Sequence, residues 1–501
     1  MTGKVEQLKT YLAEIVDLAY IGNLLGWDQE TNMPPAGVKE RGEQMATLAR
    51  LVQQRMTSDE LLRALEEAEA EVADFDPDSD EARLVKVTRR EVDKRVKVPS
   101  RYYEELSQLA VESYAAWKQA REQDNFENFR PYLERVVELR REFASYFSPY
   151  DHVYDPLLNE FEPGLKTREV QQIFNELRPQ QVALIKEITS KPQVDDSPLR
   201  QHFDPQKQWD FGVEVITKFG YDWERGRQDK AAHPFTTSFG INDVRITTRI
   251  VEDYIGSALF STMHECGHAL YDLGSDPALA RTPLAGGSSL ALHESQSRLW
   301  ENLVGRSRPF WEYFYPRLQA YFPEQLGSVS LDTFYKGINK VQPSLIRVEA
   351  DEATYNLHVM LRLELEIQLM SGELETRHLP EAWNSHMQEY LGLTPHNNAD
   401  GVLQDVHWSH GYIGYFPTYA LGNLISVQLW EAIQKDIPSL EDQIRHGEFG
   451  ELLSWLREKI HRHGGKFEAP ELVQRITGQA ITPQPYMRYL RQKYGEIYGF
   501  S

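Results

Sequence analysis

Apolar residues recur at helical spacing along most of this chain, whereas alternating strand patterns are rare. In residues 5–25, for example, Leu8, Leu12 and Ile15 fall on one face of a helix. The same spacing predicts helices over residues 40–71, 101–118 and 131–146. Residues 234–250 alternate β-branched and polar side chains on both sides of Gly240 and predict a hairpin. We therefore expect a mostly α protein with a small β-sheet near its middle.

Three segments depart from this helical pattern. The acidic tract 66–81 is interpreted as a solvated loop between helices. Residues 191–206 contain three prolines and predict either a domain boundary or a long surface loop. Residues 411–430 carry no charge and match a membrane span in length, but they include Pro417 and three tyrosines. We interpret this last segment as a buried one beside a polar cavity.

The charge of the chain excludes some partners. It has 54 Lys and Arg against 76 Asp and Glu, a net charge of −22, so its surface would repel nucleic-acid phosphates. One cysteine in 501 residues rules out an internal disulfide and fits a reducing compartment. The first residues contain no apolar signal segment. We expect a cytoplasmic protein that binds neither nucleic acid nor membrane.

The segment His264-Glu-Cys-Gly-His268 matches H-E-x-x-H. On a helix, residues i and i+4 lie one turn apart on the same face, so both imidazoles can bind one zinc ion. Glu265 lies about 100° around the helix from His264 and can act as general base toward a zinc-activated water. Cys266 lies about 200° away and is interpreted as a small buried residue. The helix is expected to end at Gly274.

A catalytic zinc site needs a third protein ligand from outside this motif. Residues 290–302 have the pattern of a second helix. Glu294 lies 26 positions after His268, which leaves enough chain to turn back and pack antiparallel. His293 and Glu301 are competing candidates on the same helix, and His293 points about 100° away from Glu294. Spacing favours Glu294 but leaves the choice open.

Five motifs in order resemble those of the zinc metallocarboxypeptidases of the carboxypeptidase Taq type. They read D-x-R-x-T, H-E-x-x-H, H-E-S-Q, I-R-x-x-A-D and G-x-x-Q-D-x-H-W. They stand at Asp243–Thr247, His264–His268, His293–Gln296, Ile346–Asp351 and Gly401–Trp408. None departs from the family pattern, and the length and helical N-terminal part are also similar to the family, so the resemblance extends to the whole chain.

This resemblance implies a mostly helical, two-lobed body with a deep groove and a small sheet near the active site, similar to neurolysin and angiotensin-converting enzyme. It implies one zinc ion per chain, for which cobalt or manganese could substitute, with His264, His268 and Glu294 as its ligands. The implied activity is the release of single C-terminal amino acids from peptides with broad specificity. Family members are typically homodimers, so a homodimer is expected.

The order of the motifs also favours one peptidase domain over residues 1–501 instead of the three modules that the chain length suggests. Within that domain, residues 1–150 would form a helical wall or lid of the groove. Residues 234–430 would form the catalytic core segment.

Peptide hydrolysis at such a site needs a donor that stabilises the oxyanion beside the zinc. Residues 411–416 resemble the tyrosine-bearing segment of helical zinc peptidases. By that resemblance Tyr415 is the favoured donor and Tyr412 contacts the substrate. His407 is a second donor candidate, and His410 could replace it, because the sequence does not distinguish the two.

An exopeptidase must also recognise the free carboxylate of its substrate. Arginine suits this task because its planar guanidinium pairs with a carboxylate through two hydrogen bonds. Arg347 is the best candidate, and a structural ion pair with Glu349 or Asp351 is the alternative. Arg245 is expected to brace the sheet edge through Asp243, and an extended peptide could pair with that edge.

Two other functions compete with this interpretation. An oligopeptide endopeptidase with the same helical zinc fold would cut peptides whose terminal carboxylate is capped, whereas a carboxypeptidase would not. A catalytically dead peptide-binding scaffold would have no need of a general base, and the intact Glu265 argues against it.

Overall fold

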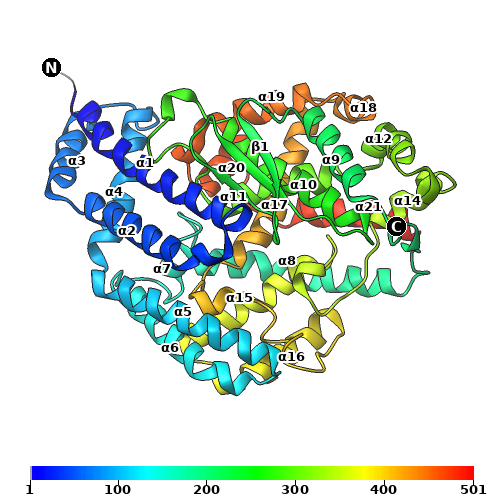
Figure 1. The fold of residues 1–501 in the computed structure, drawn as a ribbon, viewed down its shortest axis with the longest axis horizontal. Coiled ribbons are helices and arrows are strands. Elements are labelled where there is room, and N and C mark those ends of the chain that lie inside the picture. Colours follow the sequence, from blue (N-terminus) through cyan, green and yellow to red (C-terminus); the bar gives the residue numbers. More distant parts are fainter. Residues whose placement is uncertain (1–2, 501) are drawn as a thin grey trace. The chain divides into compact units, whose positions relative to one another are not determined.

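Helices account for most of residues 3–500, the part of the chain that the computed structural model describes (Figure 1). Contacts divide the chain into two units, each assembled from three separate segments. Unit 1 comprises Met1–Val96, Asp196–Ile338 and Leu429–Ile476, and unit 2 comprises Lys97–Asp195, Asn339–Gln428 and Thr477–Ser501. The predicted class, mostly α with a small sheet, is confirmed.

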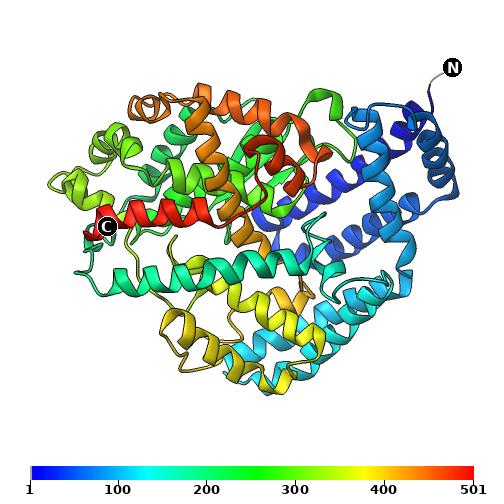
Figure 2. The same cartoon turned by 180° about the vertical axis from the view of Figure 1, so that it is seen from behind.

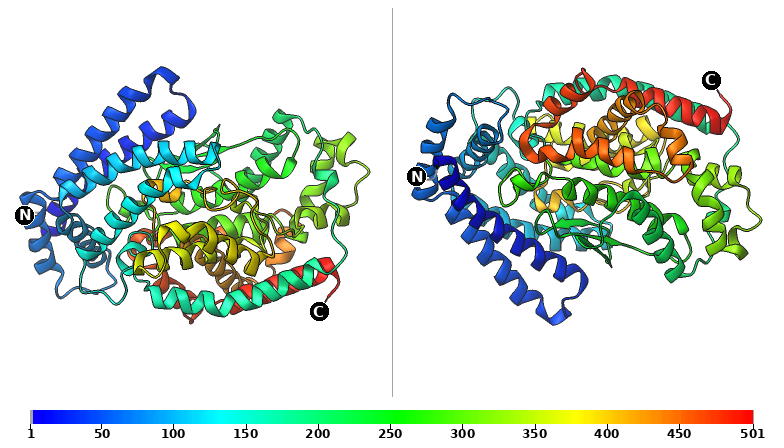
Figure 3. Two further views of the ribbon diagram at one scale, coloured as in Figure 1. Left: turned by 90° about the horizontal axis from the view of Figure 1, so that it is seen from below. Right: turned by 90° about the horizontal axis from the view of Figure 1, so that it is seen from above.

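Unit 1 contains the N-terminal helices and the sheet. Its helices are α1 (Lys4–Thr31), α2 (Val38–Met56), α3 (Asp59–Val72), α4 (Asp80–Lys97), α9 (Pro205–Phe219), α10 (Ile255–Leu273), α11 (Leu290–Arg298), α12 (Arg308–Tyr321), α13 (Pro323–Leu326), α14 (Leu331–Ile338), α18 (Leu440–Arg445), α19 (Gly450–Lys459) and α20 (Ala469–Thr477). Figure 3 shows α1 and α2 side by side, as their mutual contacts require.

Unit 2 contains helices and loops but no strand among the described residues. Its helices are α5 (Ser100–Glu122), α6 (Phe126–Ser145), α7 (Asp155–Leu158), α8 (Thr167–Thr189), α15 (Tyr355–Ser371), α16 (Leu379–Leu391) and α21 (Gln484–Tyr498). The last helix, α21, lies alongside α8 (Figures 2 and 3). One further helix, α17 (Pro417–Asp436), begins in unit 2 and ends in unit 1.

The sheet has three strands in the order β1-β3-β2. Strands β2 (Thr236–Ser238) and β3 (Val244–Thr248) pair antiparallel and confirm the predicted hairpin. Strand β1 (Gly226–Lys230) pairs parallel with β3 and was missed, because its Arg, Gln, Asp and Lys side chains lack an alternating apolar pattern. As predicted, Arg245 holds Asp243 through two hydrogen bonds of 2.8 and 2.9 Å.

The predicted helical pattern agrees with the observed helices at its apolar positions. Leu8, Leu12 and Ile15 are buried in a core that α1 shares with α3 and α4. The predicted helix over 40–71 is in fact two helices, because Ser58 caps α3 by accepting a hydrogen bond from the Leu61 N–H at 3.3 Å.

The three unusual segments also have defined structures. Residues 66–72 of the acidic tract are helical, so the loop that it forms is shorter than predicted and covers 73–79. Residues 191–206 link α8 to α9 and contain a unit boundary, between Asp195 and Asp196. Within the described chain no helix is both long and apolar enough to cross a membrane.

Candidate metal centre

The H-E-x-x-H motif lies in the middle of α10, as predicted. The rings of His264 and His268 point to the same side of this helix, with 4.9 Å between their centroids. The helix is capped at Gly274, as expected. Cys266 is fully buried, and burial raises the pKa of its thiol, which fits its interpretation as a packing residue.

A glycine inside the motif lets the second helix approach. A Cβ atom added to Gly267 would lie 2.6 Å from Cα of Ser297 and 2.7 Å from the carbonyl oxygen of Gln296. Both contacts are shorter than any real Cβ contact, and both involve backbone, which cannot move aside cheaply. The α10–α11 packing distance therefore requires glycine at position 267.

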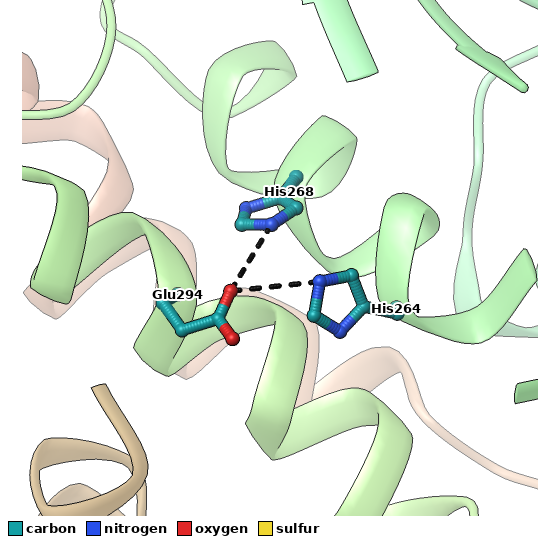
Figure 4. Close-up of side chains that lie close together, drawn as sticks. All are labelled: His264, His268 and Glu294. Atoms are coloured by element: carbon teal, nitrogen blue, oxygen red, sulfur yellow. Dashed lines mark ion pairs between the residues drawn. The ribbon is translucent and has the colours of Figure 1, made fainter. Parts of the chain in front are cut away.

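This packing brings Glu294 of α11 to the two histidines of α10 (Figure 4). Its Oε2 atom lies 3.5 Å from Nε2 of His264 and 3.5 Å from Nε2 of His268. The three ligand atoms lie within 4.8 Å of one another, so one metal ion could contact all three. Two imidazole nitrogens and one carboxylate oxygen are the donor set of a catalytic zinc site.

The two competing ligand candidates lie behind the histidines instead. Oε2 of Glu301 is 2.9 Å from Nδ1 of His264, and Nδ1 of His293 is 2.6 Å from Nδ1 of His268. These contacts occupy the Nδ1 atoms and leave both Nε2 atoms directed at Glu294. Partners of this kind fix the tautomer and orientation of metal-binding histidines.

The residues that contact the two histidines are themselves held by further hydrogen bonds. Nε2 of His293 lies 2.9 Å from Oδ1 of Asp272, and Ser238 of strand β2 donates a hydrogen bond to the same carboxylate. On the other side, Arg298 donates to Glu294 at 2.7 Å and to Glu301 at 3.0 Å. The guanidinium of Arg298 therefore holds the carboxylates of both Glu294 and Glu301 in place.

The charges of Glu294 and His268 suit metal binding, whereas Glu294 and Glu301 outweigh the effect of burial on His264 and raise its pKa. Burial opposes ionisation of Glu294, but Arg298 and the two histidines outweigh it and lower its pKa. Burial lowers the pKa of His268 to about 4, so its imidazole is neutral near pH 7. An ionised carboxylate and a neutral imidazole are the forms that bind metals.

Glu265 lies beside this triad without belonging to it. Its side chain is buried, and Thr236 Oγ1 donates a hydrogen bond to its Oε2 at 2.7 Å. Burial raises the pKa of Glu265, while His264 and the Thr236 hydrogen bond oppose that change. The carboxylate is therefore held in one orientation by strand β2.

Arg347 of unit 2 lies in a buried network of charges. Its Nε and Nη2 donate to Oδ1 of Asp405 at 3.0 and 2.9 Å, and its Nη1 donates to the Tyr355 hydroxyl at 2.8 Å. Arg362 donates to the other oxygen of Asp405 at 2.6 Å. Burial opposes the ionisation of Asp405, but the two guanidiniums outweigh it and lower its pKa. One carboxylate is thus shared by two cations.

His407 and His410 stand at opposite ends of a 3-10 turn and have different neighbours. Nδ1 of His407 lies 3.9 Å from Oδ1 of Asp405, and its Nε2 lies 3.4 Å from the Tyr419 hydroxyl. The His410 ring stacks on that of Tyr412, with 5.8 Å between centroids. Burial lowers the pKa of His407 to about 3 despite Asp405, so its imidazole is neutral. His407 belongs to the Asp405 network, and His410 does not.

The candidate tyrosines lie in the same part of unit 2. The Tyr415 ring is 5.3 Å from that of His407, and Tyr412, which is 48% exposed, stacks against Tyr415 at 5.9 Å. Tyr419 of α17 was not predicted as a site residue, although it stands four positions after Tyr415. Its ring lies 5.1 Å from the guanidinium of Arg347.

Comparisons with known proteins decide the family. Residues 7–494 match the family described as carboxypeptidase Taq (M32) metallopeptidase. The chain is 43% identical to thermostable carboxypeptidase 1 of Thermus thermophilus over 504 residues, which cover 99% of each chain. The chain belongs to the M32 family.

Solved M32 structures have the same fold. The M32 carboxypeptidase from Deinococcus radiodurans R1 superimposes with a TM-score of 0.96, 42% identity and 99% of each chain covered. The Pyrococcus furiosus carboxypeptidase, in a structure described as Apo-Mg, gives a TM-score of 0.95, 36% identity and 99% coverage of each chain. The present protein is therefore an M32 metallocarboxypeptidase, a metal-dependent hydrolase of peptide bonds.

One buried acid holds the tyrosine-bearing segment of this M32 protein. Glu366 of α15 accepts hydrogen bonds from Trp408 Nε1 at 2.8 Å, from the Gly414 N–H at 3.1 Å and from the Tyr154 hydroxyl at 2.6 Å. Burial raises the pKa of Glu366 to about 7, and these hydrogen bonds oppose the change only in part. Its three donors tie residues 408–414, and Tyr154 just before α7, to α15.

The Gly267 contact leads to a first prediction. We expect Gly267→Ala to lower the free energy of unfolding by about 1–3 kcal/mol, because the added methyl group forces the two helices apart. The same displacement moves Glu294 away from the histidines, so zinc affinity should fall, measured by competition with a chromophoric chelator. Gly42→Ala on α2 is the control, since a Cβ there meets nothing within 4 Å. Equal zinc affinity and equal stability in both variants would contradict this role of Gly267.

Glu366 leads to a prediction for pH. Its pKa is about 7 in the folded chain and about 4.5 when unfolded, so the folded state binds the extra proton between these values and loses stability as pH rises through them. We expect this loss to be on the order of 1–3 kcal/mol. The Gln side chain of Glu366→Gln does not titrate. As pH rises from about 5 to about 7.5, a range that covers most of the interval between the two pKa values, the melting temperature of this variant should therefore fall less than that of the natural protein. Parallel pH profiles would show that Glu366 does not titrate in this range.

Proposed function

We propose that this protein releases single C-terminal amino acids from peptides, with zinc held by His264, His268 and Glu294. The observation that carries the proposal is the placement of Glu294 Oε2 at 3.5 Å from Nε2 of each histidine. Support also comes from the Nδ1 atoms, whose contacts to Glu301 and His293 leave both Nε2 atoms available for one ion.

Zinc is the metal that these ligands favour. Magnesium takes oxygen ligands almost exclusively, whereas zinc accepts imidazole nitrogen together with one carboxylate. Cobalt or manganese could replace it at the same ligands. When bound there, zinc would act as a Lewis acid toward the scissile carbonyl and make a water molecule easier to deprotonate.

Glu265 is proposed as the general base. It would accept a proton from the attacking water and deliver it to the leaving amine. Its position on the motif helix next to His264, and the Thr236 hydrogen bond that orients its carboxylate, support this role.

The roles proposed for the tyrosines and histidines of unit 2 rest on the sequence resemblance. The contacts of these residues within unit 2 support the roles. Tyr415 and His407 are proposed to stabilise the oxyanion, since a neutral His407 can donate a hydrogen bond. Tyr412, exposed and stacked on Tyr415, is proposed to contact the substrate. His410, which stacks on Tyr412, is the weaker substrate contact.

Arg347 is proposed to bind the free carboxylate of the substrate. The shared Asp405 supports this role, because one carboxylate between Arg347 and Arg362 leaves a positive charge for a second anion. We also propose broad specificity, a homodimeric and cytoplasmic protein, and a single peptidase domain whose first 150 residues form a wall or lid. These proposals rest on the sequence resemblance, composition and motif order.

The test is a time course on a peptide with a blocked N-terminus, followed by mass. We expect single residues to leave one at a time from the C-terminus, with loss of activity in a chelator and recovery with zinc. Glu265→Gln should lower kcat by about a hundredfold to ten-thousandfold, because it removes proton transfer and not the metal ligands. Glu324→Gln, at an exposed position of α13, is the matched control.

Three outcomes would overturn the proposal. An internal cut as the first product would indicate the alternative endopeptidase. Equal rates on a peptide and its C-terminal amide would indicate the same, since carboxylate recognition would then play no part. Unchanged turnover in Glu265→Gln would remove the general base from the mechanism.

A further inference from the structure

A cavity of about 650 Å³ opens in unit 1 between two helices and the edge of the sheet. Helix α1 contributes residues 18, 22 and 26, which recur every four positions along one face, and α2 contributes residues 45, 48, 49 and 52. Phe235, Thr236 and Thr237 of the β2 segment close the third side. The proposed function assigns no role to this space.

The width of the cavity comes from two glycines of α1. A Cβ atom added to Gly22 would meet nothing within 4 Å, and one added to Gly26 would meet only Cε of Met45, at 4.0 Å. Glycine inside a helix costs about 1 kcal/mol relative to alanine. No backbone contact or unusual dihedral angle at these two positions requires glycine, so its effect there is to leave the space open.

The walls are mostly apolar and incompletely buried, with Asn23, Gln29 and two threonines among the polar lining residues. Leu18, Met45, Leu48 and Val52 all remain partly exposed where they line the cavity. Of the described residues that line it, Glu30 and Arg95 alone carry charge, and their charges have opposite sign. An apolar ligand group would therefore gain burial here without displacing an ion.

The cavity reaches the metal centre through Thr236. This residue lines the cavity and also donates the hydrogen bond to Oε2 of Glu265. In the antiparallel register, Phe235 and Phe239 bond to β3, so the backbone N–H and C=O of Thr236 face away from β3. On the same edge the Ser238 carbonyl already accepts a hydrogen bond from Asn23 Nδ2 at 3.1 Å, so an extended peptide can pair with the edge at Thr236.

Trp27 supplies an unused donor at the same place. Its side chain lines the cavity and is only 6% exposed, yet its indole N–H has no acceptor among the described residues. Buried indole N–H groups nearly always have a partner. The Nε1 atom is itself covered, so a peptide carbonyl in the cavity would pair with it only after the Trp27 side chain turned toward the bound peptide.

We infer that this cavity binds a large apolar side chain of the peptide substrate, from a residue just N-terminal to the scissile bond. The inference rests on the proposed function, because a carboxypeptidase leaves only one residue on the C-terminal side of the bond. An extended segment along β2 must then belong to the N-terminal side. The chemical class follows from the walls, which fit phenylalanine or leucine better than a charged side chain.

The test compares blocked peptides that carry Phe or Ala at either of the two positions before the scissile bond. We expect kcat/KM to favour Phe by about tenfold or more at one of these positions. Gly22→Leu should reduce that ratio about tenfold, because its side chain fills the cavity. Ala49→Leu fills the cavity from the opposite helix, α2, and should reduce the ratio in the same way. It provides a second test in case Gly22→Leu folds poorly.

Gly42→Leu is the matched control, because it makes the same change at a position of α2 that does not line the cavity and where an added Cβ meets nothing within 4 Å. It should keep the natural Phe/Ala ratio. No preference at either position, or the same ratio in Gly22→Leu, Ala49→Leu and Gly42→Leu, overturns the inference. Absence of C-terminal release from every peptide would instead refute the proposed function.

Trp27→Phe tests the donor separately, because it removes the indole N–H and leaves a smaller aromatic ring in its place. We expect KM for the Phe peptide to rise about two- to tenfold, and the melting temperature to fall only as far as the smaller buried ring requires. An unchanged KM would mean that the indole N–H does not contact the substrate.

Discussion

The close packing of α10 against α11 at Gly267 is the contact on which the metal centre depends. A single methyl group at this position would lie 2.6 Å from the backbone of Ser297, so glycine sets the distance between the helices. That distance places one oxygen of Glu294 at equal separation from two imidazole nitrogens. The outer partners Glu301 and His293 then orient the rings. The distance between α10 and α11 therefore also determines the geometry of the three metal ligands.

The sequence predicted the parts of this centre that depend on local geometry. The spacing of His264 and His268 is set by the helical repeat, so the H-E-x-x-H motif by itself predicts two metal ligands on one helix face. The third ligand was harder to predict, because Glu294, His293 and Glu301 all lie within about two helical turns of one another. Spacing favoured Glu294, the family resemblance selected it, and the structure assigns the other two to the Nδ1 atoms.

Features that depend on distant residues were not predictable in the same way. Arg347 pairs with Asp405, which lies 58 positions away, and not with Glu349 or Asp351. Asp351 instead accepts backbone hydrogen bonds from Ala353 and Thr354. Strand β1 carries no apolar alternation, so only its pairing with β3, 18 positions further along the chain (Gly226 with Val244), identifies it as a strand. The helical class and the hairpin, which depend on local periodicity, were predicted correctly.

The most direct measurement is anomalous diffraction at the zinc edge from crystals of the zinc-loaded protein. We expect one peak, about 2.0–2.2 Å from Nε2 of His264, Nε2 of His268 and an oxygen of Glu294. A peak bound by His293 or Glu301, or no peak at the three proposed ligands, would contradict the central claim that α10–α11 packing builds the zinc site.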